Sequence, residues 1–191
     1  MNGHHDNPLT WQVFADTCVV NRIVDFGEFF FDDYLAGETL SNYEKRPPED
    51  RDDIDALHDI LRVYHRMCMP LYVTEAVLNE VAASHRPDLL SYAREIFHHW
   101  QTWGDLAIWK RALSRGFDDH ADKIASTLRV IRGSNDRLLV AQALVMGCDV
   151  FLTVDRRSLW NRRAHESLSG ISILRPRELW DAIRPWARLV L

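Results

Sequence analysis

Short apolar runs alternate with longer segments of helical spacing along most of the chain. Residues 11–15 and 150–154 form mostly apolar runs of the length of a buried strand, and shorter runs lie at 71–73 and 171–174. Apolar strands that alternate with helices are typical of a parallel sheet whose two faces are covered by helices. We therefore expect an α/β fold, a three-layer α/β/α sandwich with a short parallel sheet of four to five strands.

Helical patterns fill the segments between these runs. We expect helices over 17–31, 54–67, 74–81, from 87 to about 100, over 103–113, 117–131, 134–146, 156–165, and after Pro176. Gly147 suits the residue just after a helix, and Pro176 suits the first position of one. The acidic, breaker-rich stretch at about 32–55 predicts a loop or insertion within a single domain spanning 1–191.

The amino-acid composition is typical of a globular protein. The chain has 191 residues, of which 47% are hydrophobic and 27% charged, as in a globular domain of ordinary size. No apolar run is long enough to cross a membrane, and the polar N-terminus resembles no signal peptide. The three cysteines match neither a zinc spacing nor a disulfide framework, so we expect reduced thiols in a cytoplasmic protein.

Charge is distributed unevenly. The net charge is -5, yet residues 1–110 carry 9 Lys+Arg against 19 Asp+Glu, while residues 111–191 carry 14 against 9. Only Lys45, Lys110 and Lys123 are lysines, and guanidinium groups suit bidentate contact with phosphates. A solvated surface explains the same arginines equally well, so both interpretations stay open.

Four carboxylates lie at or near the predicted carboxyl ends of strands, where functional groups of α/β proteins are commonly found. Asp16 follows the first strand and Asp155 follows the run at 150–154. Asp136 lies in the first turn of a predicted helix, and Glu80 lies two turns into the helix after the second strand. The carboxyl ends of parallel strands meet at one edge of the sheet, so these acids are expected to converge. Taken singly, each acid also fits an N-cap or a solvent-facing position.

Five segments in this order resemble the PIN-domain family. They are Phe14–Thr17, Thr74–Val81, Asn135–Ala141, Leu152–Asp155 and Ile173–Leu179. The first four are similar to the family segments that carry its four acids, and the last is similar to its closing strand, proline and helix. The stretch between the first and second acids is longer than a compact member needs. Some members have a further acid where this chain has Arg157.

The resemblance implies a metal-dependent active site. Its catalytic and metal-binding residues are expected to be Asp16, Glu80, Asp136 and Asp155. Thr17, Asn135 and Thr153 are expected to hydrogen-bond the carboxylates or a substrate phosphate. RNA-binding side chains are expected at Arg156, Arg157, Arg162 and Arg163. Converging carboxylates repel one another without a cation, and oxygen ligands favour Mg²⁺ or Mn²⁺, so the residues themselves agree with a metal.

The resemblance implies a divalent-metal-dependent endoribonuclease that hydrolyses RNA phosphodiesters. Many members are toxins that an antitoxin protein inhibits, and many form homodimers; these partners are expectations from the resemblance alone. A PIN-like module that binds RNA or protein without cutting is the alternative, and Arg157 in place of an acid leaves it open. A phosphatase that pairs its nucleophile with an acid two residues later is disfavoured, because Cys18 occupies that position.

Overall fold

The computed structural model describes residues 8–64, 66, 69–83, 91, 94, 95, 98, 106–157, 159, 168 and 170–187. Within these residues, four short strands form one parallel sheet in the order β2-β1-β3-β4. The strands are β1 Val13–Ala15, β2 Leu71–Tyr72, β3 Val150–Leu152 and β4 Ser172–Leu174. The predicted short parallel sheet is therefore confirmed, with β1 and β3 at its centre.

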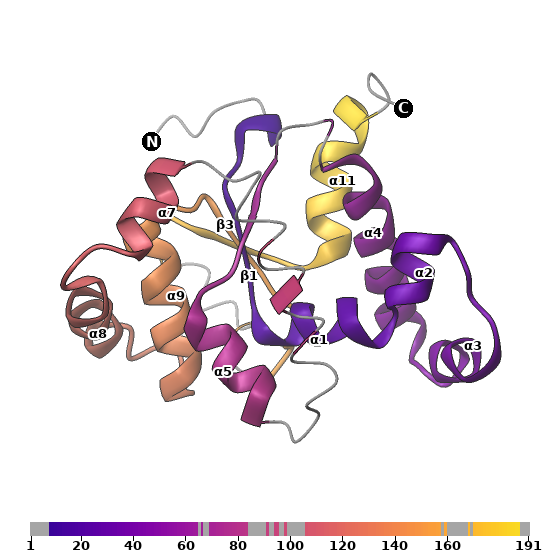
Figure 1. Ribbon diagram of the computed structural model, residues 1–191, viewed down its shortest axis with the longest axis horizontal. Helices are drawn as coiled ribbons and strands as arrows, with labels where there is room; N and C mark the ends of the chain where they lie inside the picture. The colour runs from indigo at the N-terminus through magenta and orange to yellow at the C-terminus, as the bar shows by residue number, and fades with distance from the viewer. Residues whose placement is uncertain are drawn as a thin grey trace.

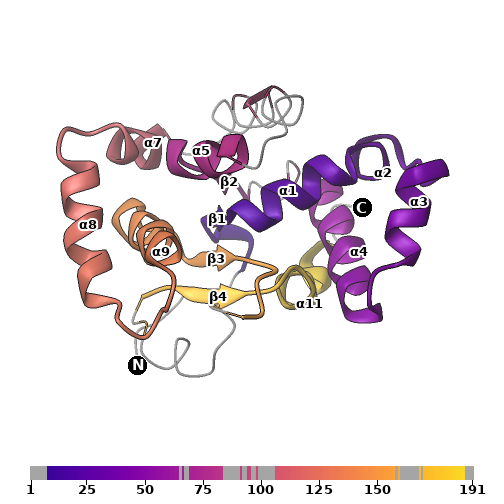
Figure 2. The same cartoon turned by 90° about the horizontal axis from the view of Figure 1, so that it is seen from below.

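Helices cover both faces of this sheet (Figure 1). They are α1 Thr17–Asp25, α2 Gly27–Asp32, α3 Gly37–Glu44, α4 Pro48–Val63, α5 Glu75–Ala83, α7 Leu106–Ala112, α8 Phe117–Thr127, α9 Ser134–Met146 and α11 Pro176–Ala187, after a 3-10 turn at Pro8–Thr10. Figures 1 and 2 show α7, α8 and α9 on one side of the sheet and α4 and α11 on the other. The three-layer α/β/α architecture predicted from the sequence is confirmed.

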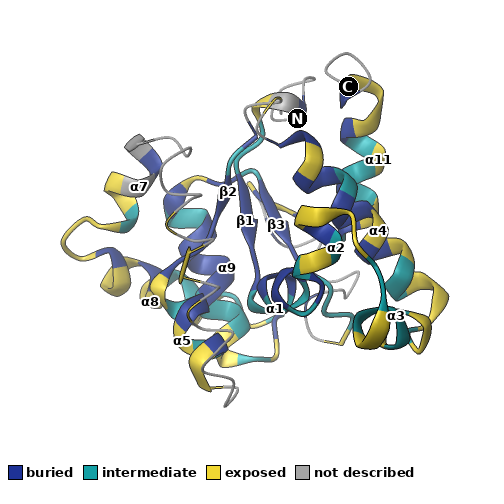
Figure 3. Ribbon diagram, turned by 45° about the vertical axis from the view of Figure 1, so that its right-hand side comes forward, coloured by how far each residue is buried: buried dark blue, intermediate teal, exposed yellow. Residues whose placement is uncertain are grey.

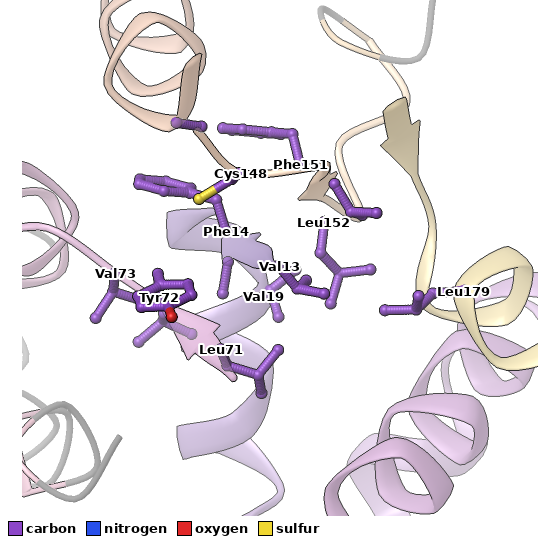
Figure 4. Packing of buried hydrophobic residues seen from close by; sticks show 14 of the residues in the cluster. Val13, Phe14, Val19, Leu71, Tyr72, Val73, Cys148, Phe151, Leu152 and Leu179 are labelled. Carbon is purple, nitrogen blue, oxygen red and sulfur yellow. The ribbon is translucent and has the colours of Figure 1, made fainter. Parts of the chain in front are cut away.

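The two central strands are apolar because both of their faces are buried. Every residue of β1 and β3 is buried, and the rings of Phe14 and Phe151 stack with their centroids 5.4 Å apart. Figure 4 shows Leu71 and Tyr72 of β2 packed beside them. This packing holds the carboxyl ends of three strands at one edge of the sheet, where the candidate site lies.

Most helix boundaries follow local chemistry. Gly147 adopts a left-handed conformation, φ 78°, directly after α9, as predicted for a residue without a side chain. Pro176 begins α11, also as predicted. The expected continuous helix over 17–31 is instead two helices that meet at Phe26, whose backbone is not helical. The expected helix from 87 to about 100 lies largely outside the described residues.

The acidic stretch at 32–55 is not the predicted loop. It contains α3 and the first half of α4, and Asp53 and Ile54 of α4 are buried. Pro48 in the first turn of α4 suits a helix start, and acids in that turn interact favourably with the helix dipole. Figure 3 shows α3 as a mixture of exposed and half-buried residues, in agreement with its lack of buried residues. The acidic and breaker-rich composition of this stretch therefore wrongly predicted a loop.

Candidate active site

Asp16 is the best-defined acid of the candidate site. It follows β1 directly, caps the N-terminus of α1, and is only 5% exposed. Its Oδ1 accepts a hydrogen bond from the backbone N–H of Thr17 at 2.7 Å. Its Oδ2 accepts hydrogen bonds from Thr153 Oγ1 at 2.7 Å and from Cys18 Sγ at 2.8 Å. Donors from the first turn of α1 and from the residue that follows β3 thus hold this carboxylate in one orientation.

Burial raises the pKa of Asp16 to about 6 from an ordinary value of 3.8. The hydrogen bonds from Cys18, Thr153 and Thr17 oppose this shift, and the negative charge of Asp136 adds to it. The charge of Asp136, in the first turn of α9, thus acts on the Asp16 carboxylate. A bound cation would relieve both the burial of this charge and its repulsion by Asp136.

Glu80 reaches the same region through Thr17. The Thr17 hydroxyl donates a hydrogen bond to Glu80 Oε2 at 2.6 Å, which links the first turn of α1 to α5. Because the backbone N–H of Thr17 also binds Asp16, one residue connects the two acids. The predicted second acid therefore lies beside the first, although they are 64 positions apart in the chain.

Asp136 and Asn135 lie in the first turn of α9. The Asp136 side chain folds over Gly133, where an added Cβ would come within 2.3 Å of its Oδ2. Gly133 therefore provides the space that the carboxylate occupies. Asn135 is exposed. Its predicted contact with a carboxylate or phosphate stays a prediction.

Asp155 is tied to the cluster by Thr153. The backbone N–H of Asp155 donates to Thr153 Oγ1 at 3.0 Å, and the same hydroxyl donates to Asp16. Thr153 is fully buried, and among the described residues its hydroxyl contacts these partners and Cys18. The Asp155 carboxylate accepts a hydrogen bond from the backbone N–H of Arg157 at 2.7 Å.

Cys18 is a member of the site that was not among the predicted site residues. Its sulfur contacts Asp16 Oδ2, lies 3.2 Å from Thr153 Oγ1, and accepts a 3.3 Å hydrogen bond from the backbone N–H of Val154. Burial, followed by the charge of Asp16, raises the pKa of the Cys18 thiol well above its usual value. The thiol therefore stays protonated and acts as a donor to Asp16. Its position two residues after Asp16 was the only available signal.

Most of this chain matches a known protein family. Residues 49–166 match the family model described as PIN domain. The chain belongs to the PIN-domain family. The matched segment contains Glu80, Asp136 and Asp155, whereas Asp16 precedes it. No curated protein and no solved structure matches the chain. PIN domains have a nuclease-type fold, which assigns this chain to a nuclease-type family.

The predicted RNA-binding arginines of this PIN domain have different surroundings. Arg156 forms ion pairs with Glu49 and Asp50 at the start of α4. The Arg157 side chain is exposed. Arg162 and Arg163 lie outside the described residues.

Metal ligation is not preformed in the described part of this PIN domain. No group of three or more His, Cys, Asp or Glu side chains there is close enough together to hold a metal ion. The hydrogen bonds nevertheless join Asp16, Glu80 and Asp155 through Thr17 and Thr153. Among the described helices, none is long and apolar enough to span a membrane.

Proposed function

We propose that this PIN domain is a divalent-metal-dependent endoribonuclease that hydrolyses RNA phosphodiesters. Asp16, Glu80, Asp136 and Asp155 are its proposed catalytic and metal-binding residues. The observation that carries the proposal is the buried Asp16 carboxylate, whose pKa is raised to about 6 and which lies close enough to Asp136 to feel its charge. Strongly perturbed carboxylates at the carboxyl end of a parallel sheet are typical of functional sites.

The donor set fits Mg²⁺ or Mn²⁺. All four proposed ligands are carboxylates, and these ions prefer oxygen ligands while keeping several of their waters. Asp16, Asp136 and Asp155 would hold the ion, with Glu80 binding it directly or through water. When bound, such an ion activates a water molecule and stabilises the developing charge on the phosphate.

The chain's own residues position these carboxylates. Thr153 and Cys18 fix the orientation of Asp16 through its Oδ2, and Thr17 holds Glu80 beside it. Thr153 also anchors the backbone at Asp155. Supporting hydrogen bonds of this kind tune metal ligands and are commonly as important as the ligands themselves.

Cleavage of labelled RNA tests the proposal. The native protein is incubated with single-stranded and structured RNA in Mn²⁺, Mg²⁺ or EDTA, beside Asp16→Asn, Asp136→Asn and Asp119→Asn. The first two variants should lose most activity, whereas the third changes an exposed acid of α8 and should keep it. Circular dichroism of all variants confirms that they fold.

Two outcomes would contradict the mechanism. Cleavage that persists in EDTA would show that the reaction needs no metal ion. Full activity of both Asp16→Asn and Asp136→Asn would show that these carboxylates are not required for catalysis. RNA binding without cleavage by the native protein would instead favour a binding module. The lack of a preformed ligand set among the described residues is the observation that supports this second candidate.

The proposal also covers the cellular location, the partner protein and the oligomeric state. We infer a cytoplasmic enzyme, supported by the free thiols of Cys18 and Cys148. A toxin inhibited by an antitoxin protein, and a homodimer, remain proposals that rest on the family resemblance. Size-exclusion chromatography with light scattering measures the oligomeric state directly.

A further inference from the structure

Arg156 points at acids that are distant in sequence. Its Nη1 pairs with Glu49, and its Nη2 lies 2.8 Å from Asp50 Oδ1, more than 100 residues earlier in the chain. The Arg156 Nε is buried and has no hydrogen-bond partner among the described residues. Because Arg156 directly follows Asp155, its backbone is next to that of a proposed catalytic residue, while its guanidinium contacts the start of α4.

Asp50 lies between two guanidinium groups. Its Oδ1 contacts Arg156, and its Oδ2 lies 3.9 Å from Arg22 Nη2, in the last turn of α1. Burial lowers the pKa of Arg22, and the positive charge of Arg46 lowers it further, so a third arginine is close by. Arginines that converge on one anion from separate elements form the arrangement in which proteins bind phosphate.

The acids at the start of α4 have a structural role as well. Glu49 and Asp50 lie in its first turn, where negative charge stabilises a helix. That role accounts for the acids but not for the orientation of Arg156 toward them. The pairs are partly exposed, with side-chain exposures of 34% for Arg156, 68% for Glu49 and 27% for Asp50. Exposed ion pairs are weak, so the phosphates of a polyanion can displace them.

The opposite side of the candidate site is unsuited to phosphate. A groove of about 440 Å³ between α5, α7, α8 and α9 is lined by Glu75, Asp118 and Asp122, with no Lys or Arg among its described lining residues. Its negative charge would repel an RNA backbone. Figure 2 shows α4 beside α11 on the other side of the sheet. Arg156 follows the end of β3 by four residues and contacts the first turn of α4.

We propose that Arg22 and Arg156 form a binding site for an RNA phosphate beside the carboxylates, and that Glu49 and Asp50 occupy it in the free protein. The inference rests on the proposed function, because it assigns the substrate path of that same site. In the free protein the two carboxylates take the place of substrate phosphates and weaken RNA binding. When RNA binds, its phosphates pair with the guanidinium groups of Arg22 and Arg156, and the carboxylates of Glu49 and Asp50 become solvated.

Fluorescence anisotropy of a labelled single-stranded RNA 12-mer, in EDTA to prevent cleavage, tests this site. The variant Glu49→Gln/Asp50→Asn is compared with Glu38→Gln/Asp119→Asn, which removes the same charge from exposed positions of α3 and α8 outside that groove. The first variant should bind RNA about three- to tenfold more tightly than this control, the range expected when one or two exposed ion pairs no longer compete. The slope of log Kd against log salt should steepen by about 0.7 for each phosphate gained.

Adding Arg22→Gln to Glu49→Gln/Asp50→Asn should abolish the gain, whereas adding Arg115→Gln, which changes an exposed arginine before α8, should keep it. Equal affinity of the two acid variants, including no measurable binding by either, would overturn the inference. So would a gain that survives Arg22→Gln. If Glu49→Gln/Asp50→Asn binds RNA more tightly but the native protein cuts no RNA, the phosphate site is supported and the nuclease function is rejected. If the native protein cuts RNA but the variant shows no gain in affinity, the nuclease function is supported and the phosphate site is rejected.

Discussion

Thr153 is the residue on which several site contacts depend. Its single hydroxyl donates to Asp16, accepts from the backbone of Asp155 and lies beside Cys18. A hydroxyl can donate one hydrogen bond and accept another at the same time, which a methyl group in this buried position could not do. The side chain therefore couples the central strand β1 to the end of β3 at the proposed metal site.

Thr153→Val should weaken Mn²⁺ binding by about 10- to 100-fold, because valine keeps the shape but cannot hydrogen-bond a metal-binding carboxylate. Isothermal titration calorimetry measures this change. Thr127→Val is the matched control, since the Thr127 hydroxyl contacts only a backbone carbonyl of α8 in an exposed position. Equal Mn²⁺ affinity in Thr153→Val and the native protein would show that Asp16 needs no such support.

At the scale of elements, α4 and α11 are joined by a buried ion pair. Asp53 is 3% exposed, and its Oδ2 binds both Nε and Nη2 of Arg175, just before α11. Its Oδ1 accepts from the backbone N–H of Arg177 at 3.3 Å. Burial raises the pKa of Asp53, and Arg175 opposes that rise. The pair fixes the helix that carries Glu49 and Asp50 against the rest of the layer.

Asp53→Ala should lower the free energy of unfolding by about 3 kcal/mol, because it leaves the largely buried charge of Arg175 without a partner. Asp52→Ala, one residue earlier in α4, removes an acid that is 58% exposed and 3.9 Å from Arg177. This control should cost less than about 1 kcal/mol. Urea denaturation measures both, and similar losses in the two variants would contradict a structural role for the buried pair.

At the scale of the whole molecule, the buried Asp16 should make stability depend on pH. Its pKa is about 6 in the folded protein and 3.8 without burial, so the native state binds the proton more tightly. The stabilising contribution is fully present below about pH 4 and is lost as pH rises through about 6. The metal-free protein thus carries an unfavourable buried charge at neutral pH, which a bound cation would compensate.

Relative to Asp16→Asn, the metal-free native protein should lose roughly 3 kcal/mol of unfolding free energy between pH 4 and 7, the equivalent of about two pKa units. Urea denaturation in EDTA across this range measures the difference. Comparing slopes rather than absolute values removes the effect of the hydrogen bonds that asparagine cannot accept. Parallel curves for the two proteins would mean that Asp16 titrates normally.

The sequence by itself determined the architecture and the positions of the acids. Strands must be apolar when both faces are buried, so their runs were visible, and Asp16 and Asp155 follow two of them. Gly147 and Pro176 marked a helix end and a helix start through backbone restrictions that need no tertiary context. These features are local, and local physics decides them.

Only the tertiary structure decided how distant charges meet. The acids at 49–53 suggested a solvated loop, yet in the fold they pair with Arg156 and Arg175. The role of Cys18 as a donor to Asp16 likewise depends on β3 bringing Thr153 to the same carboxylate. Pairing energies depend on distance and burial, and neither can be calculated from residues that are separated by a hundred positions until the sheet brings them together.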